Sequence, residues 1–556
     1  MKFTFAAKGF LKNNYILILI CLLGLNLRLL GINFGLPNYY FQPDERRLVE
    51  PAIHMVVNFA YTKDFSKLDP NMYIYPHGGV NIYFLSFYIV FYVLKVIDKI
   101  FGLYPPLFNN LHNPDFFLIA RAVVAVFGAL LSLVGYKIAR NLKFNKKYSL
   151  LYSVLLAVNF GLVVDSHFAT ANTISIFFAF LSTLLCVLAI NNGNKINKFL
   201  ILVYLSSFLV GIASSIRNLM IIYFVQVLIV LFIIYKKSFL NLVKHIIISG
   251  LFVILGAFIF SPYIFINHTS FIEDGILGIE NVEKGGQLGR TATNYIYPFF
   301  NNNKVDFDQK IPNSLFGNAG ELTFILSIFF IFYKIIKKRS STDLIFLSVL
   351  VLQILFINRY PSQMVRWYIN LIPILLIYFV YFIKEISYKK WLVIILVCFV
   401  FGLQFFRSFE YGYSKTLNDT REIADRWIKS SALFENAERT YKTFWGPHIS
   451  AKEVIEIEYN YYEYLHLLHE RSAPNASWYF CNKYVKNDYV IVSSYVTNVY
   501  KLKESKKRYP EFSKSWNNFY DYVFANFKIV KVFKGDRLFS NPGPTITILK
   551  VQCNED

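Results

Sequence analysis

Long apolar runs separated by short polar segments dominate the first 407 residues of the chain. A membrane-spanning helix needs about 20 apolar residues, or somewhat fewer when its ends are buried in protein. Eleven runs meet this requirement or nearly do, at residues 14–33, 117–140, 149–164, 170–190, 199–215, 218–235, 245–262, 320–337, 343–358, 366–384 and 391–407. The pattern therefore predicts an α-helical polytopic membrane protein with about 11 transmembrane helices.

Basic residues mark one side of this arrangement. They lie in the N-terminal tail and at residues 141–147, 191–198, 235–238, 334–340 and 384–390. Because Lys and Arg accumulate in short cytoplasmic loops, we expect these segments and the N-terminus to lie in the cytoplasm. The extracytoplasmic side then receives a first loop at 34–116, a second large loop at 263–319, a short turn at 358–368 and everything after residue 407.

One further apolar segment, residues 80–102, is also long enough to span a membrane. Counting it as a span would move the basic loop at 141–147 to the outer side. We therefore expect it to form an interfacial or re-entrant helix within the first outer loop, with its tyrosines at the level of the lipid headgroups.

Residues 408–556 have the mixed pattern of a soluble domain. They suggest a helix at 419–431 and β-rich runs at 488–496 and 545–551. The predicted organisation is a transmembrane catalytic domain at 1–407 and an extracytoplasmic α/β domain at 408–556. Cys481 and Cys553 lie in the second domain, where a disulfide between them is one alternative in an oxidising compartment.

Composition supports the membrane assignment. Hydrophobic residues make up 55% of the chain and aromatic residues 19%, too much for a soluble protein of this length. The formal net charge of +22 could suggest a nucleic-acid partner. We expect none, because the basic residues cluster in the predicted cytoplasmic loops and no nucleic-acid-binding motif is present.

Several charged residues fall at the outer ends of the predicted spans. These are Asp44, Glu45, Arg121, Asp165, His167, Arg217 and Arg366. Ionisable groups at membrane depth are costly, so their convergence on one side indicates a functional site. Acids serve proton transfer or metal binding, and arginine matches the paired oxygens of phosphate. The combination suggests a reaction on a phosphate-bearing lipid.

Structural explanations exist for the same residues. In "QPDERR" at 42–47, a proline followed by acids is a favourable helix start, which explains Asp44 and Glu45 without chemistry. Arg121 and Arg217 can snorkel to the interface. His167 suits a hydrogen-bonded interfacial position, and His77 in "YPHGGVNIY" suits a turn before a helix.

Six short segments occur in an order that is typical of one family. They are 27–45, 75–83, 118–140, 165–173, 211–218 and 366–376. In this order they resemble the family 39 glycosyltransferases, the protein O-mannosyltransferase and aminoarabinose-transferase relatives within the C-type (GT-C) superfamily. Residues 419–428 and 543–550 resemble the outer domain of many bacterial members.

The resemblance implies a GT-C fold and transfer of a sugar from a polyprenyl-phosphate donor to a protein, lipid or glycan acceptor on the extracytoplasmic face. Asp44 matches the family's catalytic acid, which takes the proton of the attacking hydroxyl, and Glu45 matches the second acid of the motif. One direct displacement would invert the anomeric carbon. The expected location is an integral membrane protein, in the plasma membrane if the source is prokaryotic.

The remaining candidates take supporting roles in this scheme. Arg121, Arg217, Arg366 and His77 are expected to bind the donor phosphate, and Arg47, Asp165, His167 and Asn172 to line the substrate pocket. No metal is required, although some relatives bind a divalent cation, for which Asp44, Glu45 and Asp165 are the candidates. Many relatives carry an acid at the position of Asn172, a departure that puts metal binding and the nature of the sugar in doubt.

Two other functions compete with this one. An oligosaccharyltransferase-like enzyme would move a whole oligosaccharide, but the Trp-Trp-Asp motif of such enzymes does not occur in the sequence. A polyprenol-lipid transporter or flippase would show two related halves, and no internal repeat is visible.

Overall fold

The computed structural model describes residues 2–36, 43–73, 76–101, 114–283, 314–337, 340–359, 365–431, 434, 437, 439–443, 446–447, 453–457, 473–482, 488–501, 506, 510–535 and 541–553. The chain divides into two compact units. The helical unit contains residues 1–276, 318–356 and 366–412, and the C-terminal unit contains 277–317, 357–365 and 413–556. Residues 284–313 of the second predicted outer loop lie outside the described residues.

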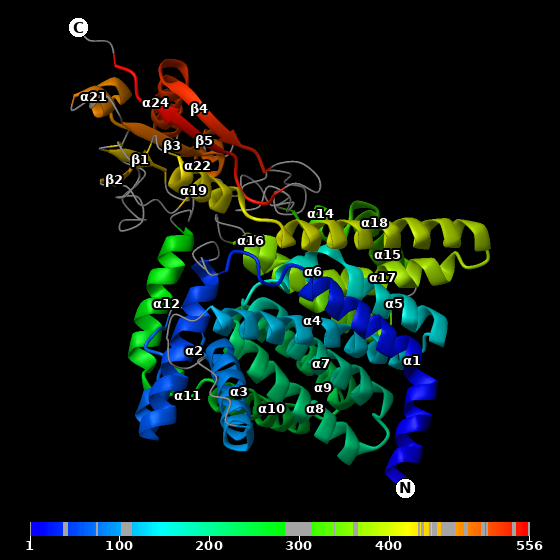
Figure 1. Ribbon diagram of the computed structural model, residues 1–556. Helices are drawn as coiled ribbons and strands as arrows, with labels where there is room; N and C mark the ends of the chain where they lie inside the picture. The colour runs from blue at the N-terminus through cyan, green and yellow to red at the C-terminus, as the bar shows by residue number, and fades with distance from the viewer. Residues whose placement is uncertain are drawn as a thin grey trace. The chain divides into compact units, whose positions relative to one another are not determined.

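Up to Thr416, the described secondary-structure elements are all helices (Figure 1). The helices before the second outer loop are α1 (Lys2–Leu29), α2 (Pro43–Thr62), η2 (Phe65–Leu68), α3 (Gly78–Phe101), α4 (Asp115–Asn141), α5 (Lys146–Val158), α6 (Phe160–Asp165), α7 (Asn172–Asn191), α8 (Ile196–Ile216), η4 (Asn218–Tyr223), α9 (Phe224–Tyr235), α10 (Phe239–Phe260), α11 (Pro262–Ile266) and α12 (His268–Glu283). Those after it are α14 (Leu315–Ala319), α15 (Glu321–Lys337), α16 (Ser341–Asn358), η5 (Val365–Trp367), η6 (Ile369–Leu371), α17 (Ile372–Glu385) and α18 (Lys390–Thr416).

All eleven predicted spans are helical, which confirms the predicted fold class. Among the described residues, eight helices are long and apolar enough to cross a membrane, and α3 is one of them. Four predicted spans, at 14–33, 149–164, 320–337 and 366–384, are not among these eight; in two of them Asn159 separates α5 from α6 and a 3₁₀ turn precedes α17. Figure 1 shows α3 beside α2 and across the direction of α4 and α7, and its interfacial position stays a prediction.

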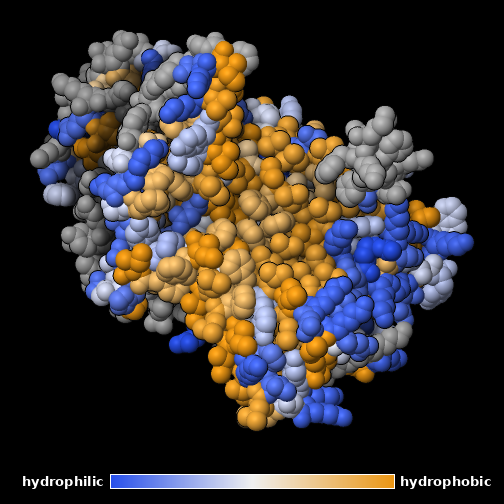
Figure 2. Space-filling view, turned by 90° about the horizontal axis from the view of Figure 1, so that it is seen from below, coloured by the Kyte–Doolittle hydropathy of each residue, from blue (hydrophilic) through white to orange (hydrophobic). Residues whose placement is uncertain are grey.

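The outer surface of the helical unit is apolar over a wide area. Figure 2 shows hydrophobic side chains that form a broad continuous patch on one face. In α10, Leu251 and Ile254 leave 59% and 54% of their surface exposed. An apolar area of this extent on a folded chain is typical of contact with lipid. The chain is therefore an integral membrane protein.

Glycines set the closest helix contacts. A Cβ at Gly211 of α8 would meet the Val253 carbonyl of α10, and one at Gly256 of α10 would meet the Phe208 carbonyl of α8. These two helices pack directly together because both positions lack a side chain. Gly128 of α4 leaves room in the same way for the side chain of Arg28 on α1.

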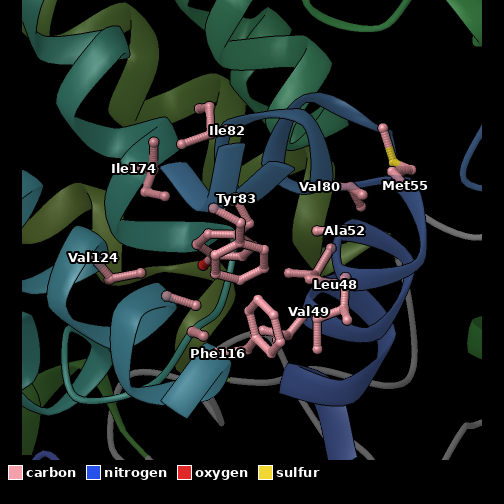
Figure 3. Close-up of a cluster of buried hydrophobic side chains, with 14 of the residues drawn as sticks. Leu48, Val49, Ala52, Met55, Val80, Ile82, Tyr83, Phe116, Val124 and Ile174 are labelled. Atoms are coloured by element: carbon pink, nitrogen blue, oxygen red, sulfur yellow. The ribbon is translucent and has the colours of Figure 1, made fainter. Parts of the chain in front are cut away.

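The first predicted outer loop contributes to an apolar cluster. Leu48, Val49 and Ala52 of α2 pack with Val80 and Tyr83 of α3, and side chains from α4 and α7 complete the cluster (Figure 3). The three α2 positions follow helical spacing, so one face of α2 is buried and the other stays polar. This packing fixes the N-terminus of α2, where the acidic motif lies.

The C-terminal unit contains a five-stranded sheet flanked by helices. Its elements are α19 (Thr420–Ser430), β1 (Thr440–Lys442), β2 (Val454–Glu456), α21 (Ala476–Cys481), β3 (Tyr489–Ser493), α22 (Ser494–Lys501), α24 (Pro510–Asn526), β4 (Lys528–Phe533) and β5 (Ile546–Lys550). The strand order is β2-β1-β3-β5-β4, with β1 parallel to β2 and β3, and β5 antiparallel to β3 and β4. The predicted helix and both β-rich runs are confirmed, except that β3 ends at Ser493 and gives way to a helix.

A disulfide joins Cys481 at the end of α21 to Cys553 just after β5, with 5.7 Å between the Cα atoms. The alternative that these two cysteines pair is thereby confirmed. Such bonds persist in oxidising compartments and are rare in the cytosol. The bond thus agrees with the predicted extracytoplasmic position of this unit.

Candidate active site

The acidic motif occupies the first turn of α2. Pro43 begins the helix, and Asp44 and Glu45 follow it directly. Proline suits the first helical position because its missing N–H would have no partner there, and acids in the first turn are stabilised by the helix dipole. Consecutive helical side chains point about 100° apart. The two acids consequently face different surroundings.

Glu45 faces the protein interior, where it pairs with Arg121 of α4. The guanidinium donates from Nε to Oε1 at 2.8 Å and from Nη2 to Oε2 at 2.7 Å, and neither side chain is more than 2% exposed. The backbone N–H of Ala169 also donates to Oε1, at 2.6 Å. Arg121 Nη1 donates to the carbonyls of Ile32 and Phe34. The pair therefore joins four separate chain segments.

Asp44 faces outward and has a more accessible environment. Its carboxylate forms an ion pair with Arg366 of η5, and the two side chains are 29% and 32% exposed. Such a pair can exchange partners with a ligand at modest cost, whereas removing one member of a fully buried pair leaves an uncompensated charge. Asp44 is thus the acid of the motif that a substrate can reach.

Arg217 lies next to Arg366. It ends α8 with an extended backbone, and its Nη1 donates to the Asn172 side-chain oxygen at 2.5 Å and to the Arg366 carbonyl at 3.1 Å. The amide of Asn172 in turn donates to Asp165 Oδ1 at 2.8 Å. The structure therefore connects Asp44, Arg366, Arg217, Asn172 and Asp165 in one polar network.

Asp165 is held in place by a break between two helices. Asn159 caps α6 by accepting from the Leu162 N–H, and it donates to Gln404 of α18. Asp165 closes α6, accepts from Thr173 Oγ1 at 2.7 Å and is only 8% exposed. Burial raises the pKa of its carboxyl, while Asn172 and Thr173 oppose that rise. It therefore orients Asn172, and through it Arg217, from behind.

The two predicted histidines lie in closed positions. His77 is fully buried, and its Nε2 contacts the Met72 carbonyl at 3.0 Å. Burial lowers the pKa of this ring. His167 is 2% exposed and contacts the carbonyls of Val163 and Leu30 at 2.8 and 3.0 Å. The positions of both rings favour the structural alternatives, a turn before a helix for His77 and a hydrogen-bonded residue for His167.

Arg28 is a buried residue that the sequence reasoning passed over. It lies in α1, is fully buried, and donates to the carbonyls of Gly24, Ala157 and Leu156 and to Ser166 Oγ. Two of these carbonyls belong to the last turn of α5, whose negative dipole end a cation stabilises. The signal that could have found it is an arginine within the first apolar run.

The three carboxylates proposed for a divalent cation are engaged with other partners. Glu45 pairs with Arg121, Asp44 with Arg366, and Asp165 with Asn172 and Thr173. Among the described residues, no group of three or more histidine, cysteine or acidic side chains gathers in a way that could hold a metal ion. We therefore derive no step through a metal.

Part of the chain matches a known family. Residues 107–266 match the family model described as dolichyl-phosphate-mannose-protein mannosyltransferase. The matched region runs from the approach to α4 through α10 and includes Arg121, Asp165 and Arg217. No curated protein sequence matches the chain significantly. The predicted resemblance to the C-type glycosyltransferases is confirmed by this match.

Solved structures also show similarity at low sequence identity. The apo oligosaccharyltransferase of Archaeoglobus fulgidus is 12% identical, with a TM-score of 0.44 over 78% of this chain, which spans 62% of that protein. The archaeal oligosaccharyltransferase AglB from the same organism, solved with an inhibitory peptide and a dolichol-phosphate, is 13% identical, with a TM-score of 0.48 over 96% of this chain and 74% of its own. ArnT from Cupriavidus metallidurans bound to undecaprenyl phosphate is 10% identical, with a TM-score of 0.47 over 96% of this chain and 98% of its own.

The helical unit, its polar network and the family match define the class of this protein. It is an integral membrane protein similar to the C-type glycosyltransferases. Within that class, the family whose model it matches is that of the dolichyl-phosphate-mannose-protein mannosyltransferases.

Proposed function

We propose that this protein is a glycosyltransferase that moves a sugar from a polyprenyl-phosphate donor to a hydroxyl-bearing acceptor at the extracytoplasmic side of the membrane. The observation that carries the proposal is the convergence of Asp44, Arg366 and Arg217 from three distant segments of the helical unit. A partly exposed acid beside two arginines suits a reaction in which a hydroxyl loses a proton and a phosphate leaves.

In the proposed reaction the acceptor oxygen attacks the anomeric carbon of the donor sugar. A carbon–oxygen bond forms on one side, and the bond from that carbon to the phosphate oxygen breaks on the other. The electron pair of the broken bond goes to the polyprenyl phosphate, and Asp44 accepts the proton of the attacking hydroxyl. The displacement inverts the anomeric carbon, and Asp44 then returns the proton to solvent.

The arginines stabilise the leaving phosphate in this scheme. Arg366 pairs with Asp44 in the present structure. Transfer of Arg366 from Asp44 to the donor phosphate would both bind the donor and free the carboxylate as a base. Arg217 presents its guanidinium next to the same segment, oriented by Asn172 and Asp165. An arginine that is preorganised toward developing negative charge supplies the stabilisation that such a leaving group requires.

Glu45 and Arg121 receive a positioning role. The Arg121 guanidinium donates to Glu45 and to the carbonyls of Ile32 and Phe34, which engages the N–H groups that a phosphate would need. The Ala169 N–H holds the Glu45 carboxylate on its other side. We therefore assign this pair to holding the first turn of α2 against α4, and no longer to catalysis or donor binding. His77 and His167, which contact backbone carbonyls inside the protein, are assigned to the same framework.

The test is a transfer assay with the full chain purified into nanodiscs and a panel of radiolabelled polyprenyl-phosphate sugars. We expect one donor to be consumed with a hydroxyl acceptor, the product to have inverted stereochemistry, and Asp44→Asn to abolish turnover. The control is Asp98→Asn on α3, an acid outside the network. Turnover that persists in Asp44→Asn, or a product that retains the donor's stereochemistry, would contradict the mechanism.

A further inference from the structure

A cavity of about 760 Å³ lies beside α2 and borders the apolar cluster at Met55 and Met72. Its walls are the polar face of α2 and the segment from η2 to the start of the next loop. Its lining includes Arg47, His54 and Asn58 from α2, and Lys67, Asp69 and Asn71 from the facing segment. Its volume is in the range that binds a small molecule.

Asp44 does not line the cavity, but it lies on the same face of α2 as four residues that do. Asp44, Arg47, Pro51, His54 and Asn58 follow one another at intervals of three and four residues, so they form a single stripe on α2. With a rise of 1.5 Å per residue, the stripe extends about 21 Å, and Arg47 lies only about 5 Å along the axis from Asp44. A molecule bound in the cavity can therefore present one end to Asp44.

The acids in the cavity wall already have partners. Arg46 Nε donates to Glu50 at 2.8 Å. Asp69 accepts from the Tyr73 hydroxyl at 2.7 Å and from the Asn267 amide at 2.6 Å. Nearby Asp64, which lies outside the lining, accepts from the Ser66 N–H and hydroxyl. These hydrogen bonds reduce the tendency of the carboxylates to claim another cation.

Two cations in the wall form no ion pair with any described residue. Arg47 is exposed on the stripe, and Lys67 faces it from η2. His54, Asn58 and Asn71 in the same wall carry side-chain groups that can hydrogen-bond a hydroxyl. The wall thus offers positive charge for an anion and hydrogen-bonding groups for hydroxyls.

We propose that this cavity binds the acceptor and that the acceptor is a sugar carrying a phosphate or carboxylate group. The inference rests on the proposed function, since it takes Asp44 as the base. The anionic group pairs with Arg47 and Lys67, and a neighbouring hydroxyl reaches Asp44. A peptide acceptor fits less well because methionine and proline are the only apolar residues in the lining, and they form no distinct pocket for a side chain.

The test measures binding of the acceptor without any polyprenyl donor. Binding can therefore fail while the transfer reaction of the proposed function is observed, and binding can be observed while transfer fails. The full chain in phosphatidylcholine nanodiscs is examined by saturation-transfer NMR with glucose 6-phosphate, glucuronate and glucose. We expect signals from the two anionic sugars and little from glucose. The variants Arg47→Gln and Lys67→Gln should each weaken binding about tenfold, as expected for loss of a charge-assisted contact. The control Lys95→Gln, at an exposed site on α3, should leave it unchanged.

Three outcomes would overturn the proposal. The first is that glucose gives the same signal as the anionic sugars. The second is that the Arg47→Gln and Lys67→Gln variants bind the anionic sugars as well as the unaltered protein does. In a further arm, nanodiscs containing phosphatidylglycerol separate a sugar from a lipid headgroup as the source of the anion. If Arg47 and Lys67 affect only association with phosphatidylglycerol, the cavity serves the membrane surface and the acceptor assignment is wrong.

Discussion

Two neighbouring acids at the start of α2 have opposite environments. The Glu45–Arg121 pair is almost completely buried, and its atoms contact backbone from two other segments. The Asp44–Arg366 pair is about one-third exposed and lies beside a second arginine. Adjacent positions in one motif therefore divide the work: one acid builds the framework, and the other remains accessible for chemistry.

Neutralising each acid in turn should have different consequences for turnover and stability. Asp44→Asn should lower turnover about 100- to 10,000-fold, the usual contribution of a general base, while leaving the melting temperature nearly unchanged. Glu45→Gln should instead lower the melting temperature, because Arg121 is left as a buried charge. Turnover with the identified donor and thermal unfolding in the same nanodiscs measure both effects. An equal loss of stability in the two variants would remove the distinction.

The buried Glu45–Arg121 pair can also be disrupted by removing the charge of Arg121. Arg121→Gln should cost about 3 to 5 kcal/mol of unfolding free energy, because it leaves the Glu45 carboxylate without its charged partner. The double variant Glu45→Gln, Arg121→Gln should recover part of this loss, since no uncompensated charge remains. Denaturant unfolding of the single and double variants gives the coupling. Additive losses would mean that the two side chains do not depend on each other.

Changes to Arg366 in the exposed Asp44–Arg366 pair should mainly weaken stabilisation of the donor phosphate and so lower turnover. Arg366→Gln is expected to reduce turnover about 100-fold, the typical effect of removing one preorganised donor to a developing anion, with little change in stability. Arg366→Lys should retain part of the activity, because it keeps the charge but not the paired geometry. Kinetics at varied donor concentration test this. Full activity in Arg366→Gln would shift the phosphate role to Arg217 alone.

The smallest expected effect concerns the framework around His77. Burial lowers the pKa of this ring, so the folded state binds a proton less readily than the unfolded chain, whose value is near 6.5. The stability contributed by the neutral ring is fully present above about pH 6.5 and is lost as the pH falls from there toward the folded-state pKa. His77→Gln should therefore show a smaller fall in melting temperature between pH 7 and 5. The exposed His54→Gln should behave like the unaltered protein.

Much of the fold follows from local patterns. The apolar runs predict the helices, and Pro43 with its following acids predicts the start of α2. The break at Asn159 could not be predicted, because it contains neither glycine nor proline and depends on Gln404, 245 residues away in the chain. The length of an apolar run also does not say whether a helix crosses the membrane or lies along it, which is the open question for α3.

The sequence predicts most residues of the candidate site but not which of them contact one another. The sequence predicts Asp44, Arg217, Arg366 and Asp165 near the outer ends of spans and Asn172 in the substrate pocket, and the five form one network. Which acid of the motif faces outward depends on Arg121, 76 residues later. The hydrogen bonds of a guanidinium are set by tertiary packing, so spacing alone could not distinguish a phosphate-binding arginine from a framework arginine.

The main chain of the turn after α1 accepts hydrogen bonds from distant side chains. Arg121 donates hydrogen bonds to the carbonyls of Ile32 and Phe34, and His167 contacts the carbonyl of Leu30. Every residue type supplies a carbonyl, so these hydrogen bonds, which fix the turn before the acidic motif, survive changes in side chain at the three accepting positions. Gly31 and Gly35 of the same turn differ, because their positive φ angles of 77° and 72° disfavour any other residue. Among distant homologues, this turn should therefore drift in sequence around two fixed glycines.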